Sequence, residues 1–579
     1  MKKVLQFPNV RSSHELNEHQ LAAIQNVEGL HCINSGAGTG KSAVLCARLQ
    51  RIHTLYPDST VLMLAFTKAA ALELKERVGN IHGVTISTIH SLSYHILKSS
   101  AWNFSVEPDA DQQVTIIADL IGNRSIVTED AVVKSLHTVK GIARPVLRVR
   151  QKFLRYLKEN HLVTFDTLPI FALSLLKKHS GLRTYWQYRY DFIQIDEAQD
   201  FDTVQVALIR ILSAKSKNLC LVGDSRQQIF GFRGASGAME EFGKIATNHS
   251  LCFSYRCNSA ILTLANSVMA QYPPLIALSN LPSLIPQFWT AKDSEDETKK
   301  VVSEILTLVN KGYSYKDIAI VYRSSSVTTA IFQELLAQNI PLSTKSPLIF
   351  KYNSQLWRTV INLLKFLDDT TSLDKLEAIL PIFYLKKSCI TDIRLMVAEQ
   401  KFSLVEGLSL LTKKPFHHDY VEELATAIEA AKSLNPARAI RHLLKHGLSR
   451  YFGEAMTIAV ENVISELQQF PTIAEFLHHV QTLKSQIDTV KEFAAKTNNL
   501  VQLMTIHTAK GSEFKCVFLI GAYDGILPSD RDDADTDEEK RLLYVAITRA
   551  KERLYITYPK FSENSIEMNK PCRFLAGRF

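Results

Sequence analysis

Two short segments hold residues whose types and spacing could bind and cleave a phosphate group. The first, INSGAGTGKS at 33–42, follows an apolar run and precedes the helix-forming run AVLCARL. Glycines in such a loop let successive backbone N–H groups point inward, and the start of a helix adds a dipole that favours an anion. The sequence therefore predicts a loop around nucleotide phosphates, with Lys41 reaching the β- and γ-phosphates and Ser42 ligating Mg²⁺.

One position departs from the strict pattern G-x-x-x-x-G-K-[ST], because Ser35 stands where the first glycine is usual. Serine is small, so we expect the loop to tolerate it. The residues expected around the phosphates are Ser35, Gly36, Ala37, Gly38, Thr39, Gly40, Lys41 and Ser42.

The second segment, DFIQIDEAQD at 191–200, ends an apolar run with carboxylates. Open α/β sheets bind ligands at the carboxyl ends of their strands, so Asp196 and Glu197 are expected beside the loop. Asp196 suits Mg²⁺, and Glu197 could orient or deprotonate an attacking water. A carboxylate that activates water indicates hydrolysis rather than transfer to an acceptor, so the two segments together predict a nucleotide hydrolase.

The elements that must position these residues alternate between strands and helices. Short apolar runs rich in β-branched residues predict buried parallel strands at 30–34, 60–66, 191–196, 218–224, 317–323, 516–522 and 553–559. Helical patterns such as KAAALELKERV separate them, and this alternation predicts doubly wound α/β cores. Two regions, about 97–172 and about 373–490, have helical periodicity with almost no strand signal and are expected to be helical insertions.

Bulk composition fits a multi-domain globular chain and disfavours other classes of protein. The 579 residues are 46% apolar and 22% charged, with a net charge of +9. The chain has no run of about 18 apolar residues, so no membrane span is expected. The start MKKVLQFPNVRSSHE lacks the apolar stretch of a secretory signal. Eight cysteines without CxxC pairs indicate buried free thiols in the cytoplasm rather than a zinc or iron–sulfur site.

Basic residues are concentrated in one segment. Between positions 140 and 158 the chain carries seven basic residues and no acidic one. Arg148, Lys152 and Arg155 fall at i, i+4 and i+7, on one face of a helix, with the aromatic residues Phe153 and Tyr156 interleaved. By itself this pattern fits a solvated helix face and a nucleic-acid contact equally well.

Further motifs follow in a fixed order. They are LNEHQLAAI (16–24), FTKAAALELKERV (66–78), STIHSL (87–92), GDSRQQIFGFRGA (223–235), SYRCN (254–258), VYRSS (321–325), LMTIHTAKGSEFKCVFLIGA (503–522) and EEKRLLYVAITRAKERL (538–554). With the two phosphate segments, the chain resembles the UvrD/Rep-like helicases of superfamily 1, subfamily A, from about residue 16 to CRFL at 572–575. The phosphate loop alone does not identify this family, whereas the ordered set is specific.

The resemblance implies a fold and a division of the chain. The fold is α/β, with two RecA-like parallel-sheet P-loop NTPase cores, each interrupted by a mainly helical insertion. The first core is expected at 1–96 and 173–285, with its insertion at 97–172. The second core is expected at 286–372 and 491–579, with a reduced helical insertion at 373–490.

The resemblance also implies roles around the nucleotide. Gln20 would bind the adenine edge, Tyr255 would stack on the adenine face, and Glu513 would contact the ribose. Gln227 would sense the γ-phosphate, and two arginines would act on it as arginine fingers. The catalytic residues implied in this way are Lys41, Asp196, Glu197, Gln227, Arg256 and Arg549.

On the DNA side, the resemblance implies aromatic stacking over a basic groove, which binds a strand without reading its sequence. The expected contacts are the aromatic residues Phe66, Phe230 and Phe232, the polar residues Thr88, His90 and His507, and the basic residues Arg148, Lys152 and Arg155. Phe230 and Phe232 replace the family's Tyr and Trp, so stacking is kept while polar ring edges are lost. Lys68 and Ala69 stand where the family has Asn and Lys.

The function implied is an ATP-dependent 3′–5′ single-stranded DNA translocase and helicase, with ATP and Mg²⁺ as cofactors. Its partners would be single-stranded DNA and junctions between single strands and duplex. The protein would be cytoplasmic and would act at the nucleoid. An alternative is an ATPase subunit that senses DNA ends or nucleotide and activates a partner such as a nuclease, with little unwinding of its own. The short second insertion favours translocation over processive unwinding, and stacking contacts are also compatible with an RNA track.

Overall fold

The structure is a computed structural model that describes residues 16–107, 110–121, 127–231, 237–344, 352, 354–385, 389–400, 405, 408, 415–452, 457–494, 496–530, 535–561 and 568–579. The chain divides into two compact units. The first comprises Met1–Tyr313, Asp317–Arg323 and Met504–Phe579, and the second comprises Ser314–Lys316 and Ser324–Leu503. The predicted division into two RecA-like cores and two helical insertions has other boundaries than these two units. That division stays a prediction.

The first sheet has six parallel strands in the order β3-β2-β6-β7-β1-β8. Its strands are β1 (Leu30–Ser35), β2 (Val61–Ala65), β3 (Val84–Thr88), β6 (Phe192–Ile195), β7 (Leu219–Gly223) and β8 (Thr247–Leu251). Strands β2, β6 and β7 are buried at every position, as expected for parallel strands covered on both faces. The strands predicted at 30–34, 60–66, 191–196 and 218–224 are confirmed, whereas β3 and β8 were not predicted.

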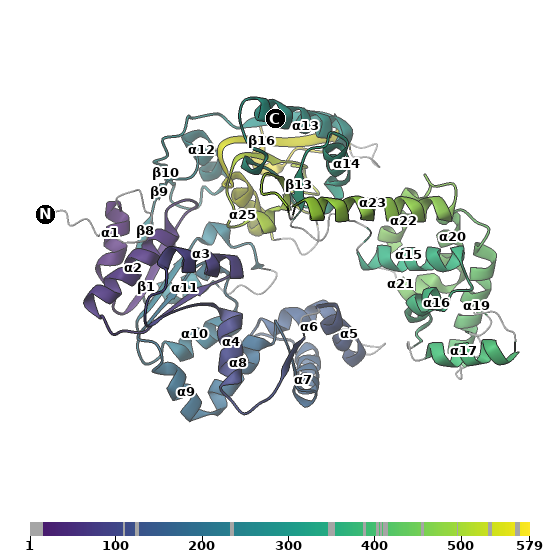
Figure 1. Ribbon diagram of the computed structural model, residues 1–579, viewed down its shortest axis with the longest axis horizontal. Coiled ribbons are helices and arrows are strands. Elements are labelled where there is room, and N and C mark those ends of the chain that lie inside the picture. The colour runs from purple at the N-terminus through teal and green to yellow at the C-terminus, as the bar shows by residue number, and fades with distance from the viewer. Residues whose placement is uncertain are drawn as a thin grey trace. The chain divides into compact units, whose positions relative to one another are not determined.

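Helices cover both faces of this sheet (Figure 1). One face packs against α1 (Glu18–Gln25), α2 (Lys41–Leu55) and α3 (Lys68–Val78). The other packs against α4 (Ile89–Lys98), α8 (Leu168–Lys178), α9 (Ser180–Gln187), α10 (Thr203–Leu212) and α11 (Ala238–Gly243). This is a doubly wound α/β core, in which the carboxyl ends of the strands carry the phosphate loop and the acid pair.

The region predicted as the first helical insertion is mainly helical. Helices α5 (Ala110–Ile121), α6 (Glu129–Leu136) and α7 (Arg144–Glu159) share a small apolar core. The region also contains β4 (Ser105–Glu107) and β5 (Leu162–Thr164), a short parallel pair that the sequence analysis did not predict. The amphipathic spacing of α7 places its apolar side on this core and leaves its basic side exposed.

The second sheet has six strands in the order β11-β16-β15-β12-β14-β13. Its strands are β11 (Gln287–Asp293), β12 (Ile318–Tyr322), β13 (Leu342–Thr344), β14 (Val501–Thr505), β15 (Phe514–Leu519) and β16 (Ala550–Phe561). Within the first unit, α12 (Ser259–Val268), α24 (Ile506–Ala509) and α25 (Thr536–Ile547) share an apolar core with β12, β15 and β16. The strands predicted at 317–323, 516–522 and 553–559 are confirmed, and so is the α/β class with two parallel-sheet cores.

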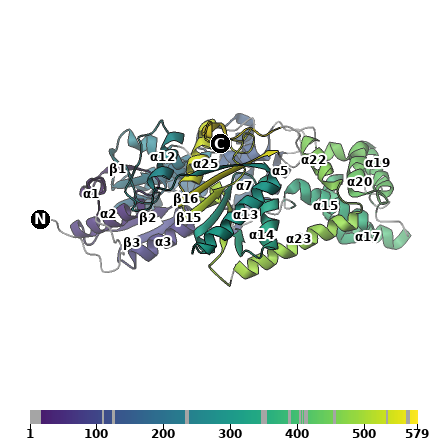
Figure 2. The same cartoon turned by 90° about the horizontal axis from the view of Figure 1, so that it is seen from above.

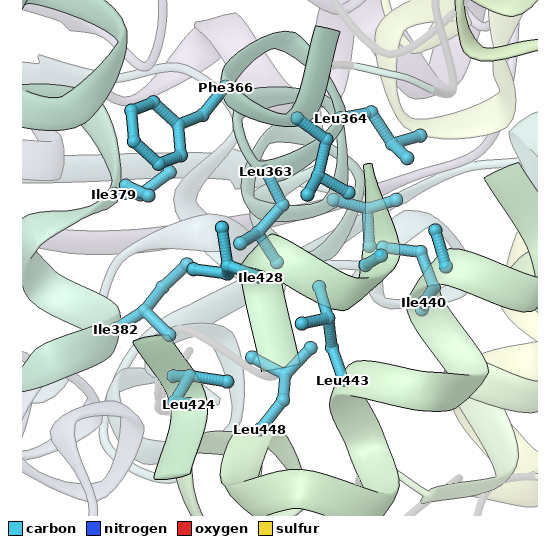
Figure 3. Close-up of a cluster of buried hydrophobic side chains, with 14 of the residues drawn as sticks. Leu363, Leu364, Phe366, Ile379, Ile382, Leu424, Ile428, Ile440, Leu443 and Leu448 are labelled. Carbon is cyan, nitrogen blue, oxygen red and sulfur yellow. The ribbon is translucent and has the colours of Figure 1, made fainter. Parts of the chain in front are cut away.

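The second unit is mostly helical. Its helices are α14 (Thr329–Ala337), α15 (Gln355–Asp368), α16 (Leu373–Ile379), α17 (Cys389–Gln400), α19 (Pro415–Ala431), α20 (Pro436–Leu443), α21 (Ser449–Phe452), α22 (Thr457–Leu467) and α23 (Ile473–Ala494). Aliphatic side chains from α15, α16, α19 and α20 form one core, and Figure 3 shows Ile428 of α19 beside Leu363 of α15, with Leu443 of α20 next to them. Figure 2 shows α23 as one long helix within this unit.

Two further expectations concern membranes and cysteines. Among the residues that the structure describes, no helix is both long and apolar enough to cross a membrane. All eight cysteines are free thiols, and six of them are buried: Cys32, Cys46, Cys220, Cys257, Cys516 and Cys572. Cys252 and Cys389 are partly exposed, so burial is confirmed for the six alone.

Candidate nucleotide and DNA-binding sites

The phosphate loop joins β1 to α2. Gly38 (φ 73°) and Gly40 (φ 83°) have left-handed backbone conformations that residues with a Cβ rarely adopt. A Cβ atom at Gly38 would also overlap the Cβ of Arg256, so the loop packs directly against the segment that carries this arginine. Ser35 donates its hydroxyl to the carbonyl of Gly223 at 2.9 Å. The residue that departs from the strict pattern therefore ties β1 to the neighbouring β7.

Lys41 lies against the acid pair at the end of β6. Its Nζ is 3.2 Å from Oε1 and 3.3 Å from Oε2 of Glu197. Glu197 has a left-handed backbone (φ 53°), and its Oε2 also accepts a hydrogen bond from Gln199 at 2.6 Å. Burial alone lowers the pKa of Lys41, but the carboxylates of Glu197, Asp224 and Asp196 outweigh burial and raise it. Lys41 is therefore a largely buried cation, with its side chain 14% exposed, that carboxylates neutralise.

The adjacent carboxylates Asp196 and Glu197 have opposite pKa shifts. Burial and the charge of Glu197 raise the pKa of Asp196 to about 7. Burial also acts to raise the pKa of Glu197, but Lys41 and Lys510 outweigh it and lower that pKa to about 2. The negative charge of Asp196 is thus less well stabilised by neighbouring cations than that of Glu197. An additional cation near Asp196 would stabilise its ionised form.

The donor set at this point fits Mg²⁺. Mg²⁺ is usually held by one or two carboxylates together with substrate phosphates and water. Asp196 supplies a carboxylate, and Ser42, in the first turn of α2, supplies a hydroxyl. In the described ranges no group of three or more His, Cys, Asp or Glu side chains could hold a metal. The remaining ligands would therefore have to come from phosphate and water.

Gln227 connects elements of the two sheets. Its Nε2 donates to Oδ2 of Asp224 at 2.6 Å, and its Oε1 accepts from Nη2 of Arg549 at 3.3 Å. Arg549 lies between α25 and β16, is 1% exposed, and donates to the carbonyl of Ser512 at 2.9 Å. Burial and the charge of Arg256 lower the pKa of Arg549 to about 9. No carboxylate among the described residues pairs with this buried guanidinium, which suits it to a phosphate.

Arg256 and Glu513 form an ion pair, with Nε 2.8 Å from Oε2. The Nζ of Lys551 lies 2.5 Å from the other carboxylate oxygen of Glu513. Burial acts to raise the pKa of Glu513, but Arg256 and Lys551 outweigh it and lower that pKa. Both residues implied at the nucleotide therefore have internal partners, and Glu513 has two.

The residues implied at adenine are brought together through Asn17. Gln20 donates from Nε2 to the carbonyl of Thr39 at 3.0 Å and accepts from the backbone N–H of Asn17 at 3.0 Å. The side-chain amide of Asn17 donates to the hydroxyl of Tyr255 at 2.7 Å, and the N–H of Tyr255 donates to the carbonyl of Gly38. Gln20 and Tyr255 therefore both contact the phosphate loop.

Lys510 is a site residue that the sequence analysis did not single out. Its Nζ lies 2.5 Å from Oδ2 of Asp200 and 2.6 Å from the carbonyl of Gln227. The same ammonium lies 5.1 Å from the centre of the Phe230 ring. Burial raises the pKa of Asp200 to about 6 although Lys510 opposes the shift. Lys510 thus contacts both Gln227, the implied γ-phosphate sensor, and an implied DNA-stacking residue.

Phe230 belongs to a row of rings. Its centroid lies 5.4 Å from that of Phe66 and 6.0 Å from that of His507, and Phe66 lies 6.2 Å from Phe201. Phe66, Phe230 and His507 are all partly exposed. The structure therefore brings together three implied strand contacts that lie far apart in the chain.

Models of two protein domain families together match almost the whole chain. The model of the UvrD/REP helicase N-terminal domain matches residues 16–144 and 142–245. The model of the UvrD-like helicase C-terminal domain matches residues 250–498 and 416–560. The chain belongs to the UvrD/Rep-like helicases. This is a family of ATP-hydrolysing DNA helicases, and the resemblance stated from the motifs is confirmed.

Individual relatives cover most of the chain at low identity. The ATP-dependent DNA helicase YjcD of Bacillus subtilis (strain 168) is 28% identical in an alignment 616 positions long, gaps included, that covers 96% of this chain and 79% of that protein. The ATP-dependent DNA helicase PcrA of Staphylococcus aureus (strain Mu50) is 27% identical in an alignment 627 positions long, gaps included, that covers 97% of this chain and 86% of that protein. The similarity to these relatives is therefore spread over the whole framework.

Two polar positions of this UvrD/Rep-like helicase serve local structure. Thr88 is the N-cap of α4, and its hydroxyl accepts the N–H of Ser91 at 3.2 Å. His90, in the first turn of α4, has its ring 6.4 Å from that of Phe165, which is 53% exposed. Phe232 lies outside the described residues. The roles of all three at DNA stay predictions.

The basic residues Arg148, Lys152 and Arg155 lie on α7, and all are exposed. None of them forms an ion pair within the part of the helicase that the structure describes. Phe153, which the sequence placed among them, is fully buried in the core of the insertion and cannot stack on a base. The face is therefore basic without that aromatic residue.

Proposed function

We propose that the chain is an ATP-driven motor that moves 3′ to 5′ along single-stranded DNA and separates strands at duplex junctions. The observation that carries this proposal is the contact between Arg549 and Gln227. It joins the segment before β16 of the second sheet to the segment after β7 of the first. A γ-phosphate held between these residues would bind elements of both sheets, and its loss would release them.

The ion pair between Lys41 and Glu197 suggests how the site responds to ATP. Phosphate oxygens would compete with Glu197 for Lys41, the residue that most lowers the pKa of this glutamate. Glu197 would then become a better proton acceptor for the attacking water. Mg²⁺ held by Ser42 and Asp196 would supply charge neutralisation at the phosphates.

Lys510 offers a route from nucleotide to DNA. Because its ammonium contacts the carbonyl of Gln227 and the face of Phe230, a shift of Gln227 on hydrolysis would also move a stacking ring. Stacked bases bind any sequence at about 1–3 kcal/mol per base, which suits a motor that must move along every sequence. In this scheme ATP hydrolysis changes how Phe230 stacks on the bases of the single-stranded DNA.

Steady-state ATP hydrolysis tests the proposal. Turnover is measured without nucleic acid and with single-stranded DNA, single-stranded RNA or blunt duplex, beside Lys41→Ala as the inactive control. We expect strong stimulation by single-stranded DNA, and strand displacement on duplexes with a 3′ tail but not a 5′ tail. Displacement from 5′ tails contradicts the polarity. Stimulation by duplex ends without displacement favours an end-sensing subunit that acts on a partner such as a nuclease.

A further inference from the structure

One histidine, with a side chain 12% exposed, joins the helical insertion to the segment that follows the acid pair. His137 is the C-cap of α6, and its Nδ1 lies 2.9 Å from Oδ2 of Asp202. Its Nε2 lies 3.7 Å from Oδ1 of Asp166. Asp202 is 5% exposed and is the N-cap of α10, where Oδ1 accepts the N–H of Gln205 at 2.8 Å. Since an ionised carboxylate only accepts, Nδ1 of His137 is the donor to Asp202.

The backbone around His137 is held on both sides. The hydroxyl of Thr203, the first residue of α10, donates to the carbonyl of His137 at 3.0 Å and accepts the N–H of Val139 at 2.9 Å. Between these two contacts, the carbonyl of Thr138 accepts from Nη1 of Arg150 at 2.7 Å. Arg150 belongs to α7 and is 9% exposed. Three consecutive residues therefore link α7 directly to the start of α10.

The far end of this link is the segment that carries the acid pair. Asp202 ends a short, tightly held stretch that begins at Asp196, because Lys41 binds Glu197 and Lys510 binds Asp200. A 3₁₀ turn over Ala198–Asp200 leaves little slack between Glu197 and Asp202. The N–H of Asp200 donates to the carbonyl of Glu197 at 3.0 Å, so a displacement of Asp202 would reach Glu197 through the backbone of this turn.

We propose that His137 is a positioning residue that couples DNA bound on α7 to the placement of Glu197. The inference rests on the proposed function, because it assumes that α7 binds DNA and that Glu197 serves hydrolysis. Phosphates bound by the exposed face of α7 would shift this helix, and Arg150 would carry the shift to Thr138 and His137. The effect is expected in kcat with DNA bound, since His137 contacts Asp166, Asp202 and Thr203 and, among the described residues, does not contact the nucleotide loop.

The test compares His137→Ala with His137→Asn, whose side-chain amide can still donate to Asp202. Five quantities are measured for each: kcat without DNA, kcat at saturating single-stranded DNA, KM for ATP, Kd for DNA, and Tm. We expect His137→Ala to keep kcat without DNA, KM and Kd within about twofold, and to lose about tenfold of the DNA stimulation, within the range of a single allosteric coupling. His137→Asn should restore most of that stimulation.

A second variant keeps the test decisive if His137→Ala fails to fold. Thr203→Val conserves volume and removes both hydrogen bonds to the 137–139 backbone, and it should show the same selective loss. In the double variant His137→Ala/Arg150→Met the loss should be no larger than in either single variant, because the residues act in series. Unchanged stimulation in both His137→Ala and Thr203→Val overturns the inference, as does a parallel loss of DNA-free turnover. A wild-type enzyme that DNA does not stimulate overturns the proposed function first, so the two failures are distinguishable.

Discussion

The nucleotide site and the exposed face of α7 differ in how far their charged side chains are exposed and paired. In the site, Lys41 and Glu197 have side chains only 14% and 20% exposed and neutralise each other. On α7, Arg148 and Lys152 are exposed and pair with no carboxylate among the described residues. A buried charge loses several kcal/mol of hydration and depends on the geometry of its partner, whereas an exposed charge is screened by salt. Single substitutions should therefore have large, specific effects in the site and small, general effects on α7.

The substitution Lys41→Ala examines the buried extreme of this comparison. Removal of the ammonium takes away the cation expected at the β- and γ-phosphates, so hydrolysis should fall to the background rate. DNA binding should stay nearly normal, because Lys41 lies in the nucleotide site. Turnover and DNA affinity are measured beside Lys75→Ala, which removes an exposed lysine of α3. Turnover that survives in Lys41→Ala excludes this loop as the phosphate site.

Arg549→Ala comes next in expected size. This guanidinium is buried and has no carboxylate partner among the described residues, so its charge is available for the γ-phosphate. We expect kcat to fall by about 10³–10⁵-fold while ATP affinity stays nearly normal, because an arginine finger acts mainly in the transition state. Single-turnover hydrolysis and nucleotide titration measure the two quantities. Arg549→Lys keeps a charge but lacks the fork that contacts Gln227 and Ser512, so it should recover only part of the rate. A loss of ATP affinity as large as the loss of kcat speaks against the finger.

Phe230→Ala examines a residue intermediate between the two regions, because its ring is partly exposed yet contacts buried Lys510. Loss of one stacking ring should weaken single-stranded DNA binding by about 1–3 kcal/mol. Fluorescence titration with a short oligonucleotide measures this change. Tyr188→Ala serves as the matched control. It removes a ring that is 66% exposed and that does not belong to the row of rings around Phe230. Equal DNA affinity in wild type and Phe230→Ala assigns Phe230 to core packing.

The fold was readable from sequence where strands are buried on both faces. Runs such as VLMLA in β2 and LCLVG in β7 are continuously apolar, and this pattern alone identifies them. Strand β8 reads TNHSL and lies at the edge of its sheet, largely exposed, so no apolar run marked it. A polar edge strand such as β8 is recognised by its hydrogen bonds to the neighbouring strand, here β1. That pairing is known only from the folded chain.

In the candidate site, residue types were readable but partnerships were not. Lys510 and Asp200 each lie in a recognised motif, yet they are 310 positions apart, and only the fold shows that they touch. Phe153 illustrates a different failure. Val149, Phe153 and Leu157 recur at intervals of four and face the core, and this spacing could have separated Phe153 from the basic face.

Neutralising Arg148, Lys152 and Arg155 together, each to Gln, examines the exposed extreme and has the smallest expected effect on binding, a change in the salt dependence of DNA affinity. Each lost phosphate contact lowers the salt dependence of single-strand binding by about 0.7, so three contacts should reduce the slope by about 2. Kd is measured over a range of salt concentrations. Turnover without DNA should change little, because the three residues lie on the insertion and not in the nucleotide site, whereas the DNA stimulation of kcat should weaken, because the phosphates that would shift α7 are bound less tightly. Replacing Lys177, Lys178 and Lys217 by Gln changes net charge equally on another exposed surface and should leave the slope unaltered. If both triple variants lower the slope alike, α7 contributes only general charge, and the contrast between a specific buried site and a DNA-binding helix face is lost.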